Sequence, residues 1–227
     1  MASYTATRKL YTLIVPVDSQ RVLLGYKKRG FGEGKYNGFG GKVEPGETIA
    51  EGAIRELEEE ACIKAKNLPY HGILFLESTA DSKAPILEIH VFTATEWAGE
   101  PMETEEMRPV WFAPPSTTHD SSDSPAIPFQ NMWEESREWL PLVLAFYFPT
   151  PRRGKIQFAH HVTFKGGLNP ETGLEDIWHG IDRKFVKWLE SGRKDDEGFP
   201  GDLEDWTEEV REQWIEKRMM AFEKNKM

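Results

Sequence analysis

Cysteine is almost absent from this sequence of 227 residues, which contains Cys62 alone. A single thiol excludes an intrachain disulfide and a cysteine-based metal site, and it favours a reducing compartment. We therefore expect a cytoplasmic protein, with the nucleus and the mitochondrion as open alternatives.

Long hydrophobic runs are missing as well. The longest apolar segment, Leu140–Phe148, includes Pro141 and Tyr147 and is far shorter than the roughly 18 residues of a membrane span. The first ten residues lack the apolar centre of a secretory signal. We expect no membrane partner.

Positive charge is scarce, because 28 Lys and Arg residues face 38 Asp and Glu residues, for a net charge of −10. Such a balance argues against a protein that wraps a nucleic-acid polymer. If an acidic protein handles a polyphosphate, it needs divalent cations to bridge the two.

Strand-like runs around one strong helix fill the first 165 residues. The runs are rich in β-branched and aromatic residues, and they are Leu10–Val17, Val22–Tyr26, Gly72–Glu77 and Ile86–Thr95. A helix is expected to begin after Thr48 and to run to about Ala61, with Glu51 completing a capping box.

The pattern changes at Gly166 to turns and helices. Ile181–Leu189 looks helical, and an apolar stripe at helical spacing starts at Leu203 and includes Trp206 and Trp214. The sequence thus predicts a domain of residues 1–165 and a helical C-terminal extension of residues 166–227. We expect its tryptophans, Trp178 among them, to pack on the core or on a second subunit, with a partner-recognition helix as the alternative.

Three glutamates in the expected helix, Glu56, Glu59 and Glu60, are three and four residues apart. This spacing puts their carboxylates on one side of the helix, where they repel one another by tenths of a kcal/mol per pair. Bound cations would offset that repulsion, and Mg²⁺, or Mn²⁺ in its place, suits hard oxygen ligands. The alternative is a charged helix surface that faces solvent.

The segment 41–63, GKVEPGETIAEGAIRELEEEACI, resembles the Nudix box, G-x5-E-x7-R-E-U-x-E-E-x-G-U with U aliphatic. Eight of nine defined positions match: Gly41, Glu47, Arg55, Glu56, Leu57, Glu59, Glu60 and Ile63. The resemblance implies an α+β Nudix fold, with a mixed β-sheet sandwiched between helices. It also implies that Glu47 pairs with Arg55 to hold the glutamates, and that the backbone of Gly40 and the side chain of Glu106 join the metal site.

Cys62 stands where the family has glycine. A glycine there ends the helix in a left-handed conformation, which costs a residue with a Cβ about 1–2 kcal/mol. Either the chain absorbs that strain or the helix ends differently. We expect intact chemistry, with a thiol redox switch as the less favoured alternative.

Blocks that flank the box resemble the mammalian-type MutT homologues, the oxidised purine nucleoside triphosphate hydrolases, over about residues 8–165. They include RVLLGYKKRGFGEGKYNGFG, EEMRPVWF and IPFQNMW. The resemblance places six residues in a base pocket: Thr12, Lys27, Phe31, Asn37, Met107 and Trp133. Asn37 offers a donor and an acceptor to a purine edge, and Phe31 and Trp133 offer flat stacking surfaces. Core packing for the two rings, and a plain turn for Asn37, are the alternatives.

Two departures from the family bear on which bases the pocket accepts. Trp133 is followed by Glu134, Glu135 and Ser136, where the family has Pro-Asp-Asp with both acids on the purine. Glu135 therefore takes the place of the first acid and Ser136 that of the second. Leu76 stands at a wall position where the family has phenylalanine. We therefore expect the range of bases that the pocket accepts to differ from that of the mammalian-type enzymes.

The resemblance implies attack at the β-phosphorus and release of pyrophosphate, with a proton acceptor among Glu59, Glu60 and Glu106 and a phosphate contact from Lys42. The sequence thus predicts that 8-oxo-dGTP and oxidised dATP are hydrolysed to monophosphates, which keeps damaged nucleotides out of DNA. One alternative is hydrolysis of another nucleoside diphosphate derivative, such as a dinucleoside polyphosphate or a nucleotide sugar. Another is a nucleotide-binding Nudix module without catalysis.

Overall fold

The structure is a computed structural model that describes residues 7–114, 124–148, 156–169 and 173–190, together with Glu209 and Gln213. Within these residues, no helix is long and apolar enough to cross a membrane. The helix expected from Leu203 onward lies outside the described residues, except that Glu209 and Gln213 are both helical.

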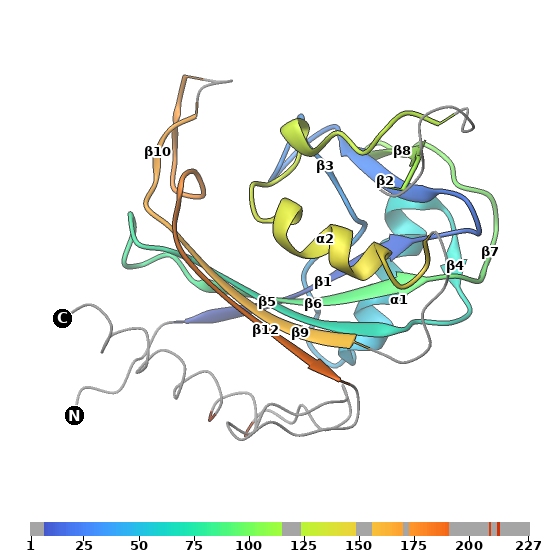
Figure 1. The fold of residues 1–227 in the computed structure, drawn as a ribbon, viewed down its shortest axis with the longest axis horizontal. Helices are drawn as coiled ribbons and strands as arrows, with labels where there is room; N and C mark the ends of the chain where they lie inside the picture. Colours follow the sequence, from blue (N-terminus) through green and yellow to red (C-terminus); the bar gives the residue numbers. More distant parts are fainter. Residues whose placement is uncertain are drawn as a thin grey trace.

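A five-stranded mixed sheet forms the curved base of the molecule (Figure 1). Its order is β1 (Arg8–Pro16), β6 (Ile86–Ala94), β5 (Tyr70–Ser78), β9 (Ile156–Phe164) and β12 (Ile181–Glu190). β1 runs parallel to β6, and β5 runs parallel to β9. The β5–β6 and β9–β12 pairs are antiparallel. Three of the four expected strand-like runs lie in this sheet, and the fourth, Val22–Tyr26, is a strand of a smaller sheet. The expected mixed sheet is confirmed.

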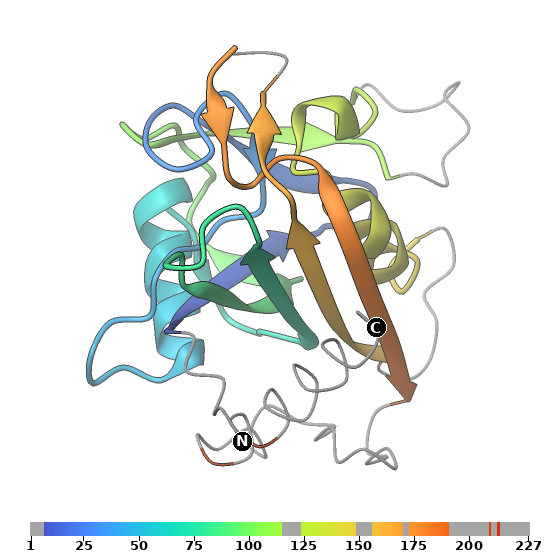
Figure 2. The ribbon, with the colours of Figure 1, turned by 90° about the vertical axis from the view of Figure 1, so that its left-hand side faces the viewer.

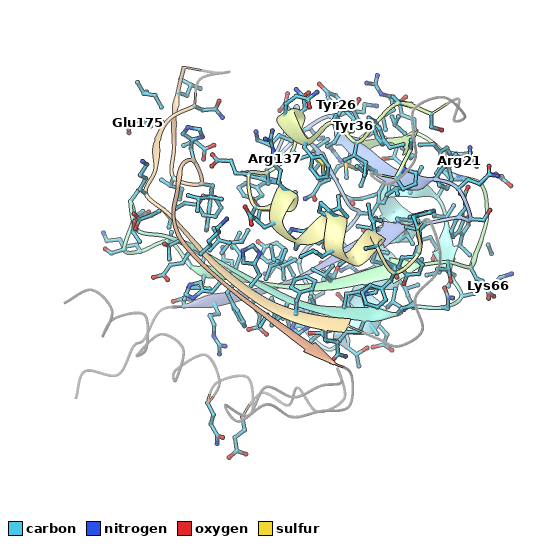
Figure 3. The ribbon with its side chains drawn as sticks, viewed as in Figure 1. Arg21, Tyr26, Tyr36, Lys66, Arg137 and Glu175 are labelled. Carbon is cyan, nitrogen blue, oxygen red and sulfur yellow. The ribbon has the colours of Figure 1, made fainter. Side chains whose placement is uncertain are left out.

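A smaller antiparallel sheet joins β3 (Tyr36–Asn37), β2 (Val22–Lys27) and β8 (Met107–Phe112). The rings of Tyr26 and Tyr36, on its paired strands β2 and β3, meet edge to face with centroids 5.2 Å apart (Figure 3). Two short ribbons complete the strands: β4 (Lys64–Ala65) with β7 (Trp97–Ala98), and β10 (Gly167–Leu168) with β11 (Glu175–Asp176). The β10–β11 ribbon projects away from the five-stranded sheet (Figure 1).

Two α-helices lie on opposite sides of the strands (Figure 2). They are α1 (Ile49–Ala61) and α2 (Ser136–Leu144), and a short 3₁₀ turn, Phe129–Asn131, precedes α2. The expected sandwich of a sheet between helices is thus confirmed. The sequence predicted only α1 before residue 165, because Pro141 lies inside α2 and proline disfavours a helix interior.

Alternating side chains of the strands divide the core between the two helices. Leu13 of β1 faces the cluster that contains Trp139 of α2, whereas its neighbour Ile14 faces the cluster that contains Leu57 of α1. This alternation follows from the two-residue period of a strand. β1 therefore anchors both halves of the molecule.

The capping box of α1 is confirmed. The Thr48 side chain accepts a hydrogen bond from the backbone N–H of Glu51 at 3.2 Å, and the Glu51 carboxylate accepts from the backbone N–H of Thr48 at 2.8 Å. Together they satisfy two N–H groups that a helix terminus leaves unpaired. The start of the helix is therefore fixed by local sequence.

The helix expected over Ile181–Leu189 is wrong, because the segment is strand β12, paired antiparallel with β9. Its Ile, Phe, Val and Trp residues have strand propensity, and pairing covers the edge that β9 would otherwise expose. β12 thus extends the five-stranded sheet, and the expectation of an extension that is helical from Gly166 is wrong for the described residues up to Glu190. Trp178 packs against the core, as one of the two expectations had it.

The end of α1 shows how the chain accommodates Cys62. This residue is the helix cap with φ 59° and ψ 22°, a left-handed conformation, and its N–H donates to the carbonyl of Glu58 at 3.0 Å. The helix therefore ends as it would with glycine, and the chain absorbs the strain of the Cβ.

Cys62→Gly is expected to stabilise the protein by about 1 kcal/mol, because it relieves that strain. The thermal midpoint should rise by about 2–4 °C, as measured by calorimetry. Cys62→Ala retains the Cβ and serves as the control. An equal rise in the alanine variant would show that the thiol, and not the backbone conformation, causes the effect.

Candidate active site

An ion pair between Arg55 of α1 and Glu47 of the preceding loop organises one end of the site. The Arg55 Nη2–Glu47 Oε1 distance is 2.8 Å and the Nε–Oε2 distance is 3.1 Å, a two-pronged contact. These hydrogen bonds hold the pKa of Glu47 well below its usual range. The pairing that the Nudix resemblance implies is therefore present.

The same guanidinium contacts two of the three helix glutamates. Arg55 Nη1 donates to Glu56 at 2.8 Å and to Glu59 at 3.2 Å, and Nη2 donates to the carbonyl of Lys42 at 3.1 Å. One cation thus orients Glu47, Glu56 and Glu59 together.

Glu60 is held from the opposite direction by Lys27 of β2. The Lys27 Nζ lies 2.8 Å from Glu60 Oε1 and 2.6 Å from Glu106 Oε1, in the loop before β8. The second oxygen of Glu60 accepts from the N–H of Gly40 at 2.8 Å. Lys27 therefore brings Glu106 beside α1, where the sequence placed it.

Burial separates the three helix glutamates. The side chains of Glu56 and Glu60 are 16% and 4% exposed, whereas that of Glu59 is 60% exposed. Burial raises the pKa of Glu56 and that of Glu60 above the usual value. Glu56 and Glu60 form the inner pair, and Glu59 lies at the solvent margin.

Glycine backbone makes room for these carboxylates. A Cβ on Gly41 would lie 2.5 Å from the Glu56 carboxyl group, and a Cβ on Gly40 would overlap the carbonyl of Thr12. The carboxylates can therefore lie directly against main chain between β1 and α1. Oxygen donors packed this way suit a hard divalent cation.

In the described part of the chain, no three acidic, histidine or cysteine side chains already converge as a ligand set. The carboxylates instead bind Arg55 and Lys27. The donor chemistry fits a divalent cation, with Glu56, Glu60 and Glu106 as the residues that would hold it.

A pocket opens beside Lys27, which is part of its lining. Its lining includes the residues that the sequence assigned to the base: Thr12, Lys27, Phe31, Asn37, Met107 and Trp133. Gly40, Glu106 and Glu135 line it too. Residues far apart in the sequence thus line one pocket, which contains Glu106, one of the carboxylates, as well as several aromatic side chains.

Aromatic rings define the far end of the pocket. Phe31 stacks on Trp133 with ring centroids 5.0 Å apart and an interplanar angle of 27°. Phe31 is 60% exposed, so the pair forms a rim and not a buried core contact. Such rings provide stacking surfaces for a planar ligand.

Two residues of the pocket lining carry buried polar atoms that have no protein partner among the described residues. These atoms are the Thr12 hydroxyl oxygen and Glu135 Oε2. The Asn37 amide oxygen accepts from the N–H of Gly38 at 2.9 Å, which leaves its NH₂ group as a donor. Buried unpaired groups cost about 1–3 kcal/mol each, a cost that a polar ligand would remove.

The residues that depart from the family pattern lie in different places relative to the pocket. Glu135 lines the pocket, whereas Ser136 is fully buried at the start of α2 and is not part of the lining. Leu76 does line the pocket. The Lys42 side chain is exposed and outside the lining, so the structure does not bring it to the pocket.

Sequence reasoning missed three aromatic residues of the pocket, Tyr11, Phe164 and Trp178. Phe164 ends β9, and Trp178 follows the β10–β11 ribbon. Phe164 lies at the end of the predicted domain, and Trp178 lies in the predicted C-terminal extension. The signal available was the aromatic Phe164, two residues before the Gly166–Gly167 pair.

Comparison with known proteins identifies the class that this helix and fold define. A family model described as the NUDIX domain matches residues 7–143, more than half of the chain. The chain belongs to the Nudix family and is a Nudix hydrolase. Members of this family generally need divalent cations, in agreement with the donor chemistry of the site.

Two curated relatives share the name oxidized purine nucleoside triphosphate hydrolase. The Danio rerio protein is 45% identical over 138 residues, and the Mus musculus protein is 43% identical over 139 residues. Each alignment covers 61% of this chain and 81% of the relative. A crystal structure of the mutator MutT protein from Bacillus halodurans matches with a TM-score of 0.56 at 20% identity, over 78% of this chain and 97% of that one. This last match supports the fold alone.

The raised pKa of Glu135 predicts how the stability of the protein depends on pH. Burial raises its pKa from 4.5 to about 7 in the folded protein, so between these values the folded state holds a proton that the unfolded chain has lost. Its contribution to stability is complete below pH 4.5 and is lost as pH rises through 7, by at most about 3 kcal/mol. Glu135→Gln, which stays neutral, should therefore gain stability relative to the wild type between pH 5 and pH 8.

Urea unfolding at the two pH values, in EDTA, measures this difference. Glu138→Gln is the matched control, since Glu138 lies three residues further along, in the first turn of α2, and is only partly buried. A stability difference between Glu135→Gln and the wild type that is equal at pH 5 and pH 8 would contradict a raised pKa at Glu135.

Proposed function

We propose that this enzyme hydrolyses oxidised purine nucleoside triphosphates, such as 8-oxo-dGTP and oxidised dATP, to the monophosphate and pyrophosphate with Mg²⁺. Mn²⁺ is its expected substitute. The names of the two curated relatives support this substrate class. By removing damaged triphosphates, the reaction would keep oxidised bases out of DNA.

One observation carries the proposal. Thr12 and Glu135, each with a buried polar atom that has no partner within the part that the structure describes, line an aromatic pocket that shares Lys27 with the acidic site on α1. A nucleotide has the matching layout, with a planar, hydrogen-bonding base at one end and a charged phosphate chain at the other.

At the base end, Phe31 and Trp133 offer stacking surfaces. The Asn37 NH₂ group donates to an acceptor on the base, and the Thr12 hydroxyl can donate or accept. Glu135, with a pKa of about 7, can present either a proton or a lone pair near neutral pH. It can therefore meet either form of an oxidised purine edge, a role that serine at position 136 cannot duplicate.

At the phosphate end, Glu56, Glu60 and Glu106 would hold the divalent cation, which supplies charge neutralisation and a more acidic water. Arg55 keeps Glu56 and Glu59 oriented, while Gly40 N–H and Lys27 orient Glu60. Lys27 also places positive charge where the base pocket meets the carboxylates. Glu59 and Glu60 of α1, and Glu106, which Lys27 joins to Glu60, are the candidate proton acceptors.

Product chromatography tests the substrate class. With Mg²⁺ present, 8-oxo-dGTP and oxidised dATP should give monophosphate well ahead of dGTP and ATP, with pyrophosphate as the second product. Dinucleoside polyphosphates and nucleotide sugars belong in the same panel. Faster turnover of any of them would overturn the proposed substrate, and no turnover of any compound would indicate a binding module.

Glu56→Gln is expected to lower kcat by at least about 100-fold, because the amide cannot supply the negative charge that holds a cation. Glu58→Gln is the matched control, since Glu58 is on the same helix but exposed, with Lys64 3.6 Å away. Steady-state kinetics of both variants against the wild type give the comparison. Undiminished turnover in Glu56→Gln would refute its metal role.

A further inference from the structure

Trp178 lines the base pocket although it lies well beyond residue 143, where the family match ends. It follows the projecting β10–β11 ribbon and precedes β12 (Figure 1). The chain therefore completes the pocket with a segment outside the matched domain.

The ring of Trp178 contacts two aromatic residues of the pocket. It meets Phe31 edge to face at 6.2 Å and 77°, and Phe164 at 6.0 Å and 76°. Phe31 in turn stacks on Trp133. Trp178 thus contacts the exposed Phe31 ring, as Trp133 also does, and adds its own surface to the pocket lining.

Backbone contacts hold Trp178 in this place. The Ser78 hydroxyl donates to the carbonyl of Ile177 at 2.8 Å, and the N–H of Trp178 donates to Asp176 Oδ1 at 2.9 Å. Ile177 is therefore tied to β5 and the backbone of Trp178 to the ribbon, which restricts where the Trp178 ring can point.

Glu134 makes the third attachment. Its carboxylate accepts from the N–H of Gly180 at 3.0 Å and of Ile181 at 3.3 Å, and His179 Nδ1 lies 3.1 Å away. Glu134 is the residue between Trp133 and Glu135. A single side chain therefore fastens the Trp178 segment to the loop that carries two pocket residues.

We propose that Trp178 is a base-contacting residue that sets affinity for the purine, and that Glu134 is the positioning residue that fixes it. This rests on the proposed function of the same pocket. Trp178 forms one wall for the planar base, and the Glu134 contacts keep that wall at a constant distance from Trp133 and Glu135. The chemical step occurs at the other end of the pocket, beside Lys27, and does not depend on either residue.

Trp178→Ala should raise KM for 8-oxo-dGTP about 3- to 10-fold, the size of a lost aromatic contact, with kcat within about twofold. The affinity for the product 8-oxo-dGMP, measured by calorimetry without metal, should fall by the same factor. Trp178→Phe keeps a ring and should recover most of both. Circular dichroism reports whether each variant is folded, and Trp178→Leu replaces the alanine variant if that one unfolds.

Glu134→Ala should raise KM in the same direction, and the double variant should be no worse than Trp178→Ala alone, because Glu134 acts through Trp178. Glu138→Ala is the matched control. Glu138 also joins α2 to β12, through Lys184 Nζ at 2.7 Å, but it is not part of the pocket lining. Its KM should equal that of the wild type.

The outcomes separate this inference from the proposed function. If the wild type neither hydrolyses 8-oxo-dGTP nor binds 8-oxo-dGMP, the proposed function is wrong. If the wild type does both, and folded Trp178→Ala or Trp178→Leu keeps the wild-type KM and product affinity, the role of Trp178 is wrong. Additive effects of Glu134→Ala and Trp178→Ala would overturn the positioning role of Glu134.

Discussion

The neutralisation of buried carboxylates by two cationic side chains is the constraint on which the rest of the site depends. Glu56 and Glu60 are mostly buried, and burial disfavours their charged forms. Arg55 of the same helix donates to Glu56, and Lys27 of β2 donates to Glu60. Because each cation also binds a second acid, Glu47 or Glu106, the network joins α1, its preceding loop, β2 and the loop before β8.

Local signals determined which part of the fold could be predicted. The α1 helix follows from its capping box and from the spacing of its residues, both of which act within a few positions of the chain. β12 could not be predicted this way, since its apolar spacing suits a helix, and its state is decided by pairing with β9. The left-handed cap at Cys62 is an intermediate case. The way the helix ends favours this conformation, whereas a residue with a Cβ disfavours it.

The same distinction applies to the site. Thr12, Asn37 and Trp133 could be placed by resemblance, and the structure brings them to one pocket. Phe164 and Trp178 could not, because they depend on how residues 156–190 return to the sheet. Ser136 shows the limit of placement by position, as its side chain is buried in α2 outside the lining while its neighbour Glu135 faces the pocket.

The two ends of the site are therefore built under different constraints. The carboxylate end depends mainly on charges within one helix and its preceding loop, to which β2 adds Lys27 and the loop before β8 adds Glu106. A short motif therefore specifies most of it. The aromatic end needs only flat apolar surfaces in the right place, and such surfaces can come from any segment that packs there. Glu134 shows how a later segment is recruited, because a carboxylate beside Trp133 captures two backbone N–H groups after Trp178. Base recognition can thus change through added chain while the phosphate chemistry stays fixed.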